Sequence, residues 1–132
     1  MTARPTALLV EDVDEHRQLV RLSIEKMFDC AVLEARDGVE GAVLAVQHRP
    51  DLIITDLDMP RMGGIELIAF IRRCPTTSTI PIVVLTLRDA AQQGRVDVSD
   101  LGILACLRKP FKPQQLQQTL AATGWTARTT GE

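Results

Sequence analysis

The stretch Leu52-Ile53-Ile54-Thr55-Asp56 decides the fold class. Its apolar run suits a strand buried on both faces of a parallel sheet, and the run stops abruptly at a carboxylate. In open α/β sheets, ligands bind at this edge, outside the carboxyl ends of the strands. Three more apolar runs end at polar residues: residues 7–10 before Glu11-Asp12, residues 81–85 before Thr86, and residues 105–108 before Lys109-Pro110. The sequence therefore predicts that an acid pair, a single acid, a hydroxyl and an amine meet at one sheet edge.

The composition indicates one compact domain. The chain has 132 residues, of which 45% are hydrophobic, enough for a real core. A formal net charge of -2 without a Lys/Arg block argues against direct nucleic-acid binding. Cys30, Cys74 and Cys106 lack the spacing of a metal or redox site, so we expect reduced, mostly buried thiols. No apolar run approaches the ~18 residues that span a bilayer and no signal peptide is recognisable, so we expect a soluble, cytoplasmic protein without membrane contacts.

Segments with a helical period alternate with the apolar runs. This repeated β-then-α unit favours a parallel sheet covered on both faces by helices. We expect helices over residues 14–27, 38–49, 65–73, 89–99 and 114–122, with capping oxygens for the first from residues 12–14. The residues expected on the buried faces are Leu19, Val20, Ile24 and Met27 in the first helix, Val39, Ala42, Val43 and Val46 in the second, Ile65, Ile68 and Ile71 in the third, and Leu116 and Leu120 in the last.

The residues at the strand ends carry the chemistry. Glu11, Asp12 and Asp56 would lie within ~5 Å of one another, where each pair of carboxylates repels by roughly 3 kcal/mol at an effective dielectric near 20. Such a cluster requires a cation, and oxygen ligands with room for water suit Mg²⁺. Lys109 would supply a fixed positive charge and Thr86 a hydroxyl on the far side of Asp56. A phosphoryl group on Asp56 would then meet metal, ammonium and hydroxyl, which makes Asp56 the candidate nucleophile.

With these residues in place, nearly the whole chain resembles a receiver domain of the two-component response regulator family, of the chemotaxis type. Each matching motif is weak alone, but together, in order and at the strand ends, they are highly specific. The matching motifs are Glu11-Asp12, Thr55-Asp56-Leu57-Asp58-Met59-Pro60-Arg61-Met62-Gly63-Gly64, Thr86, and Lys109-Pro110-Phe111.

The resemblance implies a flavodoxin-like, three-layer α/β/α fold with five helices and a five-stranded parallel sheet in the order 2-1-3-4-5. It implies that Asp56 accepts a phosphoryl group from a sensor histidine kinase or a histidine phosphotransfer protein. Thr86 and Lys109 would assist this reaction, and Glu11, Asp12, Asp56 and Asp58 would surround Mg²⁺. The surface around the fourth and fifth helices would then switch to bind a downstream protein. The protein would be a signalling phosphoacceptor rather than an enzyme, with at most self-catalysed phosphorylation and dephosphorylation. The resemblance also implies a cis Lys109-Pro110 bond.

Two positions depart from the family pattern. Receiver domains usually carry Tyr or Phe three residues before the Lys, as the partner of the hydroxyl in the switch, and here that position holds Cys106. The switch residues are therefore Thr86 and Cys106, and the usual readout through the aromatic ring is in question. Leu87 stands where a small residue is common, and the next residue, Arg88, could pair with Asp58 across the mouth of the site.

Alternative interpretations remain open. The strand followed by Asp56-Leu57-Asp58 is similar to the opening of haloacid-dehalogenase-type phosphatases, although that motif normally lies on the first strand. A receiver-like module that is never phosphorylated is the third possibility. We assign residues 1–125 to the receiver domain and residues 126–132 to a polar tail or the start of a linker. We favour a free-standing receiver over a part of a longer regulator or hybrid kinase. The last helix is rich in glutamine and almost uncharged, so we expect a monomer or a weak homodimer.

Overall fold

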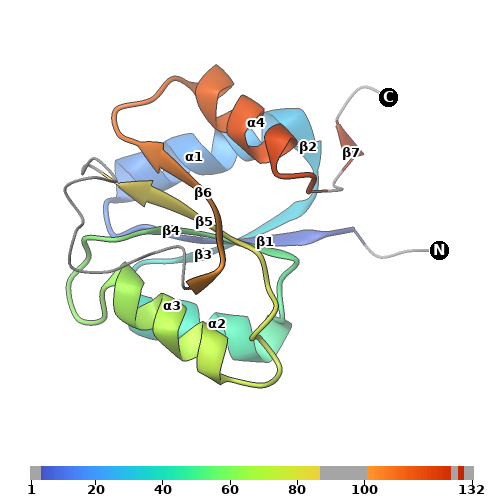
Figure 1. Ribbon diagram of the computed structural model, residues 1–132. Coiled ribbons are helices and arrows are strands. Elements are labelled where there is room, and N and C mark those ends of the chain that lie inside the picture. The colour runs from blue at the N-terminus through green and yellow to red at the C-terminus, as the bar shows by residue number, and fades with distance from the viewer. Residues whose placement is uncertain (1–3, 87–100, 126–127, 130–132) are drawn as a thin grey trace.

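The computed structural model describes residues 4–86, 101–125 and 128–129. A five-stranded sheet lies between two layers of helices (Figure 1). All its neighbouring strands pair in parallel, in the order β3-β1-β4-β5-β6, which is 2-1-3-4-5 when these five strands are counted along the chain. The predicted flavodoxin-like sheet is thereby confirmed. The strands are β1 (Thr6–Val10), β3 (Ala31–Ala35), β4 (Leu52–Asp56), β5 (Ile82–Thr86) and β6 (Ile103–Arg108).

Among the described residues, two helices cover each face of the sheet. α1 (Asp14–Met27) and α4 (Pro113–Ala122) lie on one face, and α2 (Gly38–His48) and α3 (Gly64–Arg73) lie on the other (Figure 1). These bounds agree closely with four of the five predicted helices. The fifth, expected over residues 89–99, lies outside the described residues, as do Leu87 and Arg88. Within the described part of the chain, no helix combines the length and the apolar character needed to cross a membrane.

The core consists of two halves separated by the sheet. Successive side chains of a strand point to opposite faces, so Leu9 and Ile54 pack beneath α1 and α4, while Leu8 and Ile53 pack toward α2 and α3. The central strands β4 and β5 are buried on both faces, because every one of their residues is inaccessible or nearly so. The near-continuous apolar runs in the sequence follow from this two-sided burial.

α2 turns a different face inward from the one that its valines predict. Val39, Val43 and Val46 are 38%, 48% and 42% exposed, so the prediction that they are buried is wrong. The reason is the short distance between helix and sheet: a Cβ on Gly41 would lie 3.0 Å from Val10 Cγ2. Only small side chains fit in this space. The buried residues of α2 are Gly38, Gly41, Ala42 and Ala45.

α1 also differs in detail from its prediction. Val20 and Ile24 are buried as expected, but Leu19 is exposed, and Ser23 takes the inward position between them, where its hydroxyl donates to the Leu19 carbonyl. The expected capping by residues 12–14 is absent, since the cap residue Val13 makes no side-chain cap bond. α3 and α4 bury the predicted Ile68, Ile71, Leu116 and Leu120, while Met27 and Ile65 pack only partly buried against the core.

A small antiparallel sheet joins the tail to the domain. β2 (Phe28–Asp29) follows α1 directly and pairs with β7 (Arg128–Thr129). The Trp125 ring packs against Phe28, with a distance of 5.2 Å between the ring centroids. The sequence offers no periodic signal for so short a pairing and predicts only a polar tail or a linker at residues 128 and 129.

Candidate functional site

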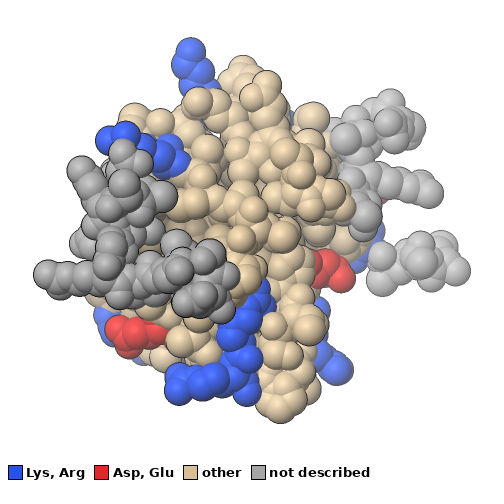
Figure 2. Space-filling model, in the orientation of Figure 1, with Lys and Arg blue, Asp and Glu red and all other residues tan. Residues whose placement is uncertain are grey.

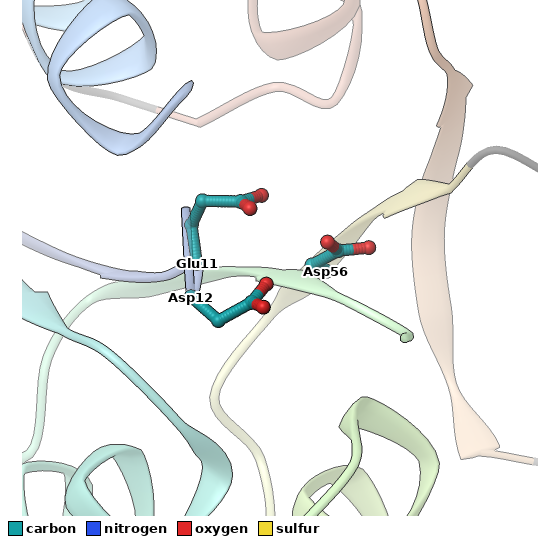
Figure 3. A group of neighbouring side chains, drawn as sticks. All are labelled: Glu11, Asp12 and Asp56. Carbon is teal, nitrogen blue, oxygen red and sulfur yellow. The ribbon is translucent and has the colours of Figure 1, made fainter. Parts of the chain in front are cut away.

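Three carboxylates converge at the carboxyl edge of the sheet. Glu11 and Asp12 follow β1, and Asp56 ends the neighbouring strand β4, where Val10 pairs with Thr55. Their ligating oxygens all lie within 4.8 Å of one another, and the side chains point into a common space (Figure 3). Glu11 and Asp56 are buried, whereas Asp12 is half-buried. The structure therefore brings together the three acids that the strand ends predict.

Lys109 provides the positive charge in this cluster. Its Nζ donates to Glu11 Oε2 at 2.8 Å and to Asp56 Oδ2 at 3.1 Å. The backbone also holds Lys109 at this edge, because its N–H donates to the Thr86 carbonyl at 2.7 Å. Burial lowers the pKa of Lys109, but the hydrogen bond to Glu11 and the charges of Asp56 and Glu11 outweigh that effect and raise it overall. Lys109 is therefore a permanent ammonium between two acids.

Glu11 is the acid most affected by its surroundings. Burial raises its pKa, the hydrogen bond from Lys109 opposes this, and the charge of Asp56 raises it further. Glu11 Oε1 accepts from the Val13 N–H at 3.2 Å, and its backbone carbonyl accepts from Arg17 Nη1 at 2.9 Å. These bonds fix the turn between β1 and α1. Among the described residues, Lys109 pairs with Glu11 and Asp56 but not with Asp12, so the ionised cluster of three carboxylates keeps an excess of negative charge that a cation can neutralise.

The Asp56 carboxylate is oriented on both of its oxygens. Oδ1 accepts from the Leu57 N–H at 2.8 Å and more weakly from the Asp58 N–H at 3.4 Å, while Oδ2 faces Lys109. Gly64 allows this arrangement, because a Cβ there would lie 2.1 Å from the Asp56 carbonyl oxygen. The Gly64 N–H donates to the Leu57 carbonyl at 3.0 Å and closes the loop that follows β4.

The remaining predicted site residues lie at different depths. Thr86 is buried at the end of β5, next to the strand that carries Asp56. Asp58 is exposed on the loop after β4 and is not one of the three converging acids. The Lys109-Pro110 bond is cis, as the family resemblance implies. Arg88, the suggested partner of Asp58, falls outside the described residues.

Cys106 is exposed, which corrects the expectation of mostly buried thiols. Cys30 is buried and Cys74 is intermediate, but Cys106 lies on the edge strand β6, whose residues alternate between half-buried and exposed. A side chain on the outward half of that alternation contacts solvent rather than the core. Cys106 therefore occupies the position expected for a switch residue without being enclosed.

Sequence reasoning missed three polar residues around the site. Arg17 bonds to Glu11 and also pairs with Glu34 at 3.3 Å, which ties the β1–α1 turn to β3. Asp37 and Arg61 form an ion pair of 3.0 Å next to the loop after Asp56. Arg17 and Glu34 are 17 residues apart in the chain, and Asp37 and Arg61 are 24 residues apart. Only a topology that places the strand ends side by side could have suggested these pairs.

Comparison with known proteins identifies the family of this chain. The response regulator receiver domain family, represented by its family model, matches residues 7–121. The chain belongs to this family. It is 37% identical over 120 residues to response regulator MprA of Mycobacterium sp. (strain KMS), with 89% of this chain and 50% of that protein covered. It is 34% identical over 113 residues to hybrid signal transduction histidine kinase D of Dictyostelium discoideum, with 86% and 7% covered.

A solved structure gives the same result for the fold. Chemotaxis response regulator CheY4 of Vibrio cholerae superposes with a TM-score of 0.83 at 30% identity, covering 92% of this chain and 99% of that one.

The curated relatives are longer than this chain. Phosphate regulon transcriptional regulatory protein PhoB of Pseudomonas aeruginosa is 30% identical over 118 residues, which are 89% of this chain but 50% of that protein. The receiver domain thus spans half or less of these curated relatives. The chain is a receiver domain of the signalling phosphoacceptor class, and this assignment argues against the phosphatase alternative.

Proposed function

We propose that Asp56 accepts a phosphoryl group from the phosphohistidine of a sensor histidine kinase or a histidine phosphotransfer protein. The observation that carries this proposal is the environment of Asp56, whose carboxylate lies between two other acids and the Lys109 ammonium. In the reaction, a carboxylate oxygen of Asp56 forms the new O–P bond as the N–P bond of the donor breaks. Lys109 offsets the negative charge that accumulates as the two anionic groups approach each other.

The acidic cluster fits a divalent cation, for which we propose Mg²⁺. Three carboxylates within 4.8 Å offer only oxygen ligands, which hard cations prefer. Glu11, Asp12 and Asp56 would hold the ion, with Asp58 beside them on the loop. When bound, Mg²⁺ would neutralise phosphoryl oxygens and so reduce the repulsion between donor and acceptor. Thr86, buried one strand away from Asp56, is the proposed hydroxyl partner of the phosphoryl group.

Phosphorylation of Asp56 would regulate the binding of a downstream protein. The face over β6 and α4 is mostly uncharged (Figure 2), and the ten residues of α4 contain no charged side chain. A partner on this face would therefore rely on apolar and amide contacts rather than on salt bridges. We infer that any turnover is limited to self-catalysed loss of the phosphoryl group. A cytoplasmic location, direct binding to protein rather than nucleic acid, and the monomeric or weakly dimeric state stay predictions.

The test is phosphorylation with acetyl phosphate and Mg²⁺, followed by intact-protein mass spectrometry. The parent protein should gain the mass of one phosphoryl group, and the adduct should be labile to base. Asp56→Asn should gain none. Asp29→Asn, which removes an acid beyond α1 at the other end of the sheet, should behave like the parent. A stable adduct on Asp56→Asn would place the acceptor elsewhere, and sustained phosphate release without an adduct would favour a phosphatase.

A further inference from the structure

The N-terminus of α2 and the loop after Asp56 are joined by an ion pair and a backbone hydrogen bond. We call residues 57–63 the acceptor loop. Its Arg61 Nη1 donates to Asp37 Oδ2 at 3.0 Å, and its Met62 carbonyl accepts from the Gly38 N–H at 3.1 Å. A Cβ on Gly38 would lie 2.3 Å from that same carbonyl oxygen, so helix and loop touch through their backbones.

Asp37 serves both elements, with one oxygen for each. Its Oδ1 accepts from the Glu40 N–H at 2.9 Å and caps α2, while Oδ2 accepts from Arg61. The Asp37 side chain is only 11% exposed, so its charge needs these partners. Arg61 adopts the left-handed conformation, with φ of 68°, which a residue other than glycine adopts only at a cost. The ion pair offsets part of that cost.

The acceptor loop in turn orients the Asp56 carboxylate. Leu57 and Asp58 donate their N–H groups to Asp56 Oδ1 from the beginning of the loop, and the Gly64 N–H closes it by donating to the Leu57 carbonyl. Arg61 lies three residues after Asp58 and three before Gly64 in this closed loop. A shift of Arg61 is therefore transmitted through a few backbone bonds to the two amides that hold Asp56.

We propose that Asp37 and Arg61 are positioning residues for phosphoryl transfer. Their ion pair holds the acceptor loop against α2, so that the Leu57 and Asp58 amides stay aimed at Asp56 and Asp58 stays beside the acidic cluster. Neither residue touches the reacting atoms. This inference rests on the proposed function of Asp56. It means that the turn between β3 and α2, which carries Asp37, helps to position the acceptor for phosphoryl transfer.

Two variants remove the ion pair while preserving the local backbone. Arg61→Asn keeps a residue that tolerates the left-handed conformation, and Asp37→Asn keeps an oxygen that can cap α2. Arg36→Ala is the matched control, because Arg36 precedes Asp37 in the chain and its ion pair, at 3.6 Å, is with Glu40 of α2 rather than with the loop. Thr77→Ala is a control for stability alone. Its buried hydroxyl donates to the Ile71 carbonyl at the far end of α3.

The measurements are the rate of phosphorylation by acetyl phosphate across a Mg²⁺ titration, the melting temperature, and the amide shifts of Leu57 and Asp58. We expect Arg61→Asn and Asp37→Asn to react about three- to five-fold more slowly at subsaturating Mg²⁺, the size of effect given by a partly exposed ion pair. Both should shift the two amide resonances before any phosphoryl donor is added. Arg36→Ala and Thr77→Ala should keep the parent rate and amide shifts, and Thr77→Ala should melt earlier.

The controls separate the outcomes. If the parent gains a phosphoryl group but the Asp37 and Arg61 variants keep its rate and amide shifts, the positioning role is overturned and the function of Asp56 stands. If Thr77→Ala slows the reaction as much as they do, loss of stability explains the effect and the positioning role is again overturned. If the parent gains no phosphoryl group, the proposed function itself fails.

Discussion

Replacing Asp12 with Asn should stabilise the metal-free protein, although Asp12 lies in the functional site. A carboxylate oxygen of Asp12 lies within 4.8 Å of oxygens of Glu11 and Asp56. Lys109 pairs with Glu11 and with Asp56 but not with Asp12, so the charge of Asp12 has no such compensation. Two unit charges at the 4.8 Å limit repel by about 3.5 kcal/mol at an effective dielectric of 20 and by about 0.9 kcal/mol in bulk water. Because Asp12 is half-buried and Lys109 offsets part of the repulsion, we expect a gain of about 1–2 kcal/mol in the free energy of unfolding.

Thermal unfolding in EDTA at low ionic strength measures this gain. A difference of 1–2 kcal/mol corresponds to a melting temperature that is higher by about 4–8 °C in a domain of this size. The difference should shrink as salt is added, since Asp12 is accessible to screening. Mg²⁺ should then reverse the order of stability. At about 100 times its Kd the ion stabilises the parent by about 2.7 kcal/mol, and Asp12→Asn, with one ligand fewer, should gain far less.

Asp29→Asn is the charge-matched control, and it should not be stabilised, because Asp29 pairs with Arg4 at 3.1 Å. An Asp12→Asn protein that is less stable than the parent in EDTA would refute the reasoning. So would a gain that does not depend on salt, because the stabilisation could then not arise from relieved repulsion.

Three further predictions concern the same molecule. Lys109→Ala should stay folded but lose the coupling between phosphorylation and structure, because the ammonium that would anchor the phosphoryl oxygens is gone; amide shifts on adding beryllofluoride and Mg²⁺ as large as those of the parent would contradict this. Gly64→Ala should destabilise the protein by about 2 kcal/mol or more and slow phosphorylation, since its Cβ would lie 2.1 Å from the Asp56 carbonyl oxygen. An unchanged midpoint of denaturant unfolding would show that the loop moves to accommodate the Cβ without a loss of stability. Burial raises the pKa of Cys30 from 9.0 to about 11, whereas hydrogen bonds with Thr76 lower the pKa of Cys74. Iodoacetamide at pH 8 should therefore label Cys74 well before Cys30, as measured by peptide mapping. The free energy of unfolding should fall between pH 9 and 11, because the Cys30 thiol ionises there in the unfolded chain but not in the folded one.

The sheet and the acidic cluster could be predicted because each depends on a local pattern. A strand buried on both faces needs an uninterrupted apolar run, and the residue after such a run lies at the edge where ligands bind. Asp56, Glu11 and Lys109 could therefore be brought together without knowing a single side-chain contact. The cis peptide before Pro110, by contrast, could be expected only from the family resemblance.

The faces of the helices could not be predicted as well, because hydrophobicity does not decide them alone. α2 lies so close to β1 that Gly41 and Ala45 face inward while Val43 faces solvent. Side-chain volume, which the periodicity of hydrophobic residues does not contain, determined that orientation. The Asp37–Arg61 pair was missed for another reason. It joins two loops 24 residues apart, and neither residue stands out from the many polar residues found in turns.

The position of Trp125 determines what the intrinsic fluorescence of this protein can report. It is the only tryptophan in the chain, and its ring packs against Phe28. The nearby residues Pro5, Asp51 and Pro81 come directly before β1, β4 and β5. The functional site lies at the opposite ends of these strands. A five-residue strand separates the two ends by about 16 Å, so emission should change when the ring loses its packing and hardly at all when an ion or a phosphoryl group reaches Asp56. Tryptophan emission is thus an indicator of unfolding, and ligand occupancy at Asp56 needs a label placed at the opposite end of the sheet.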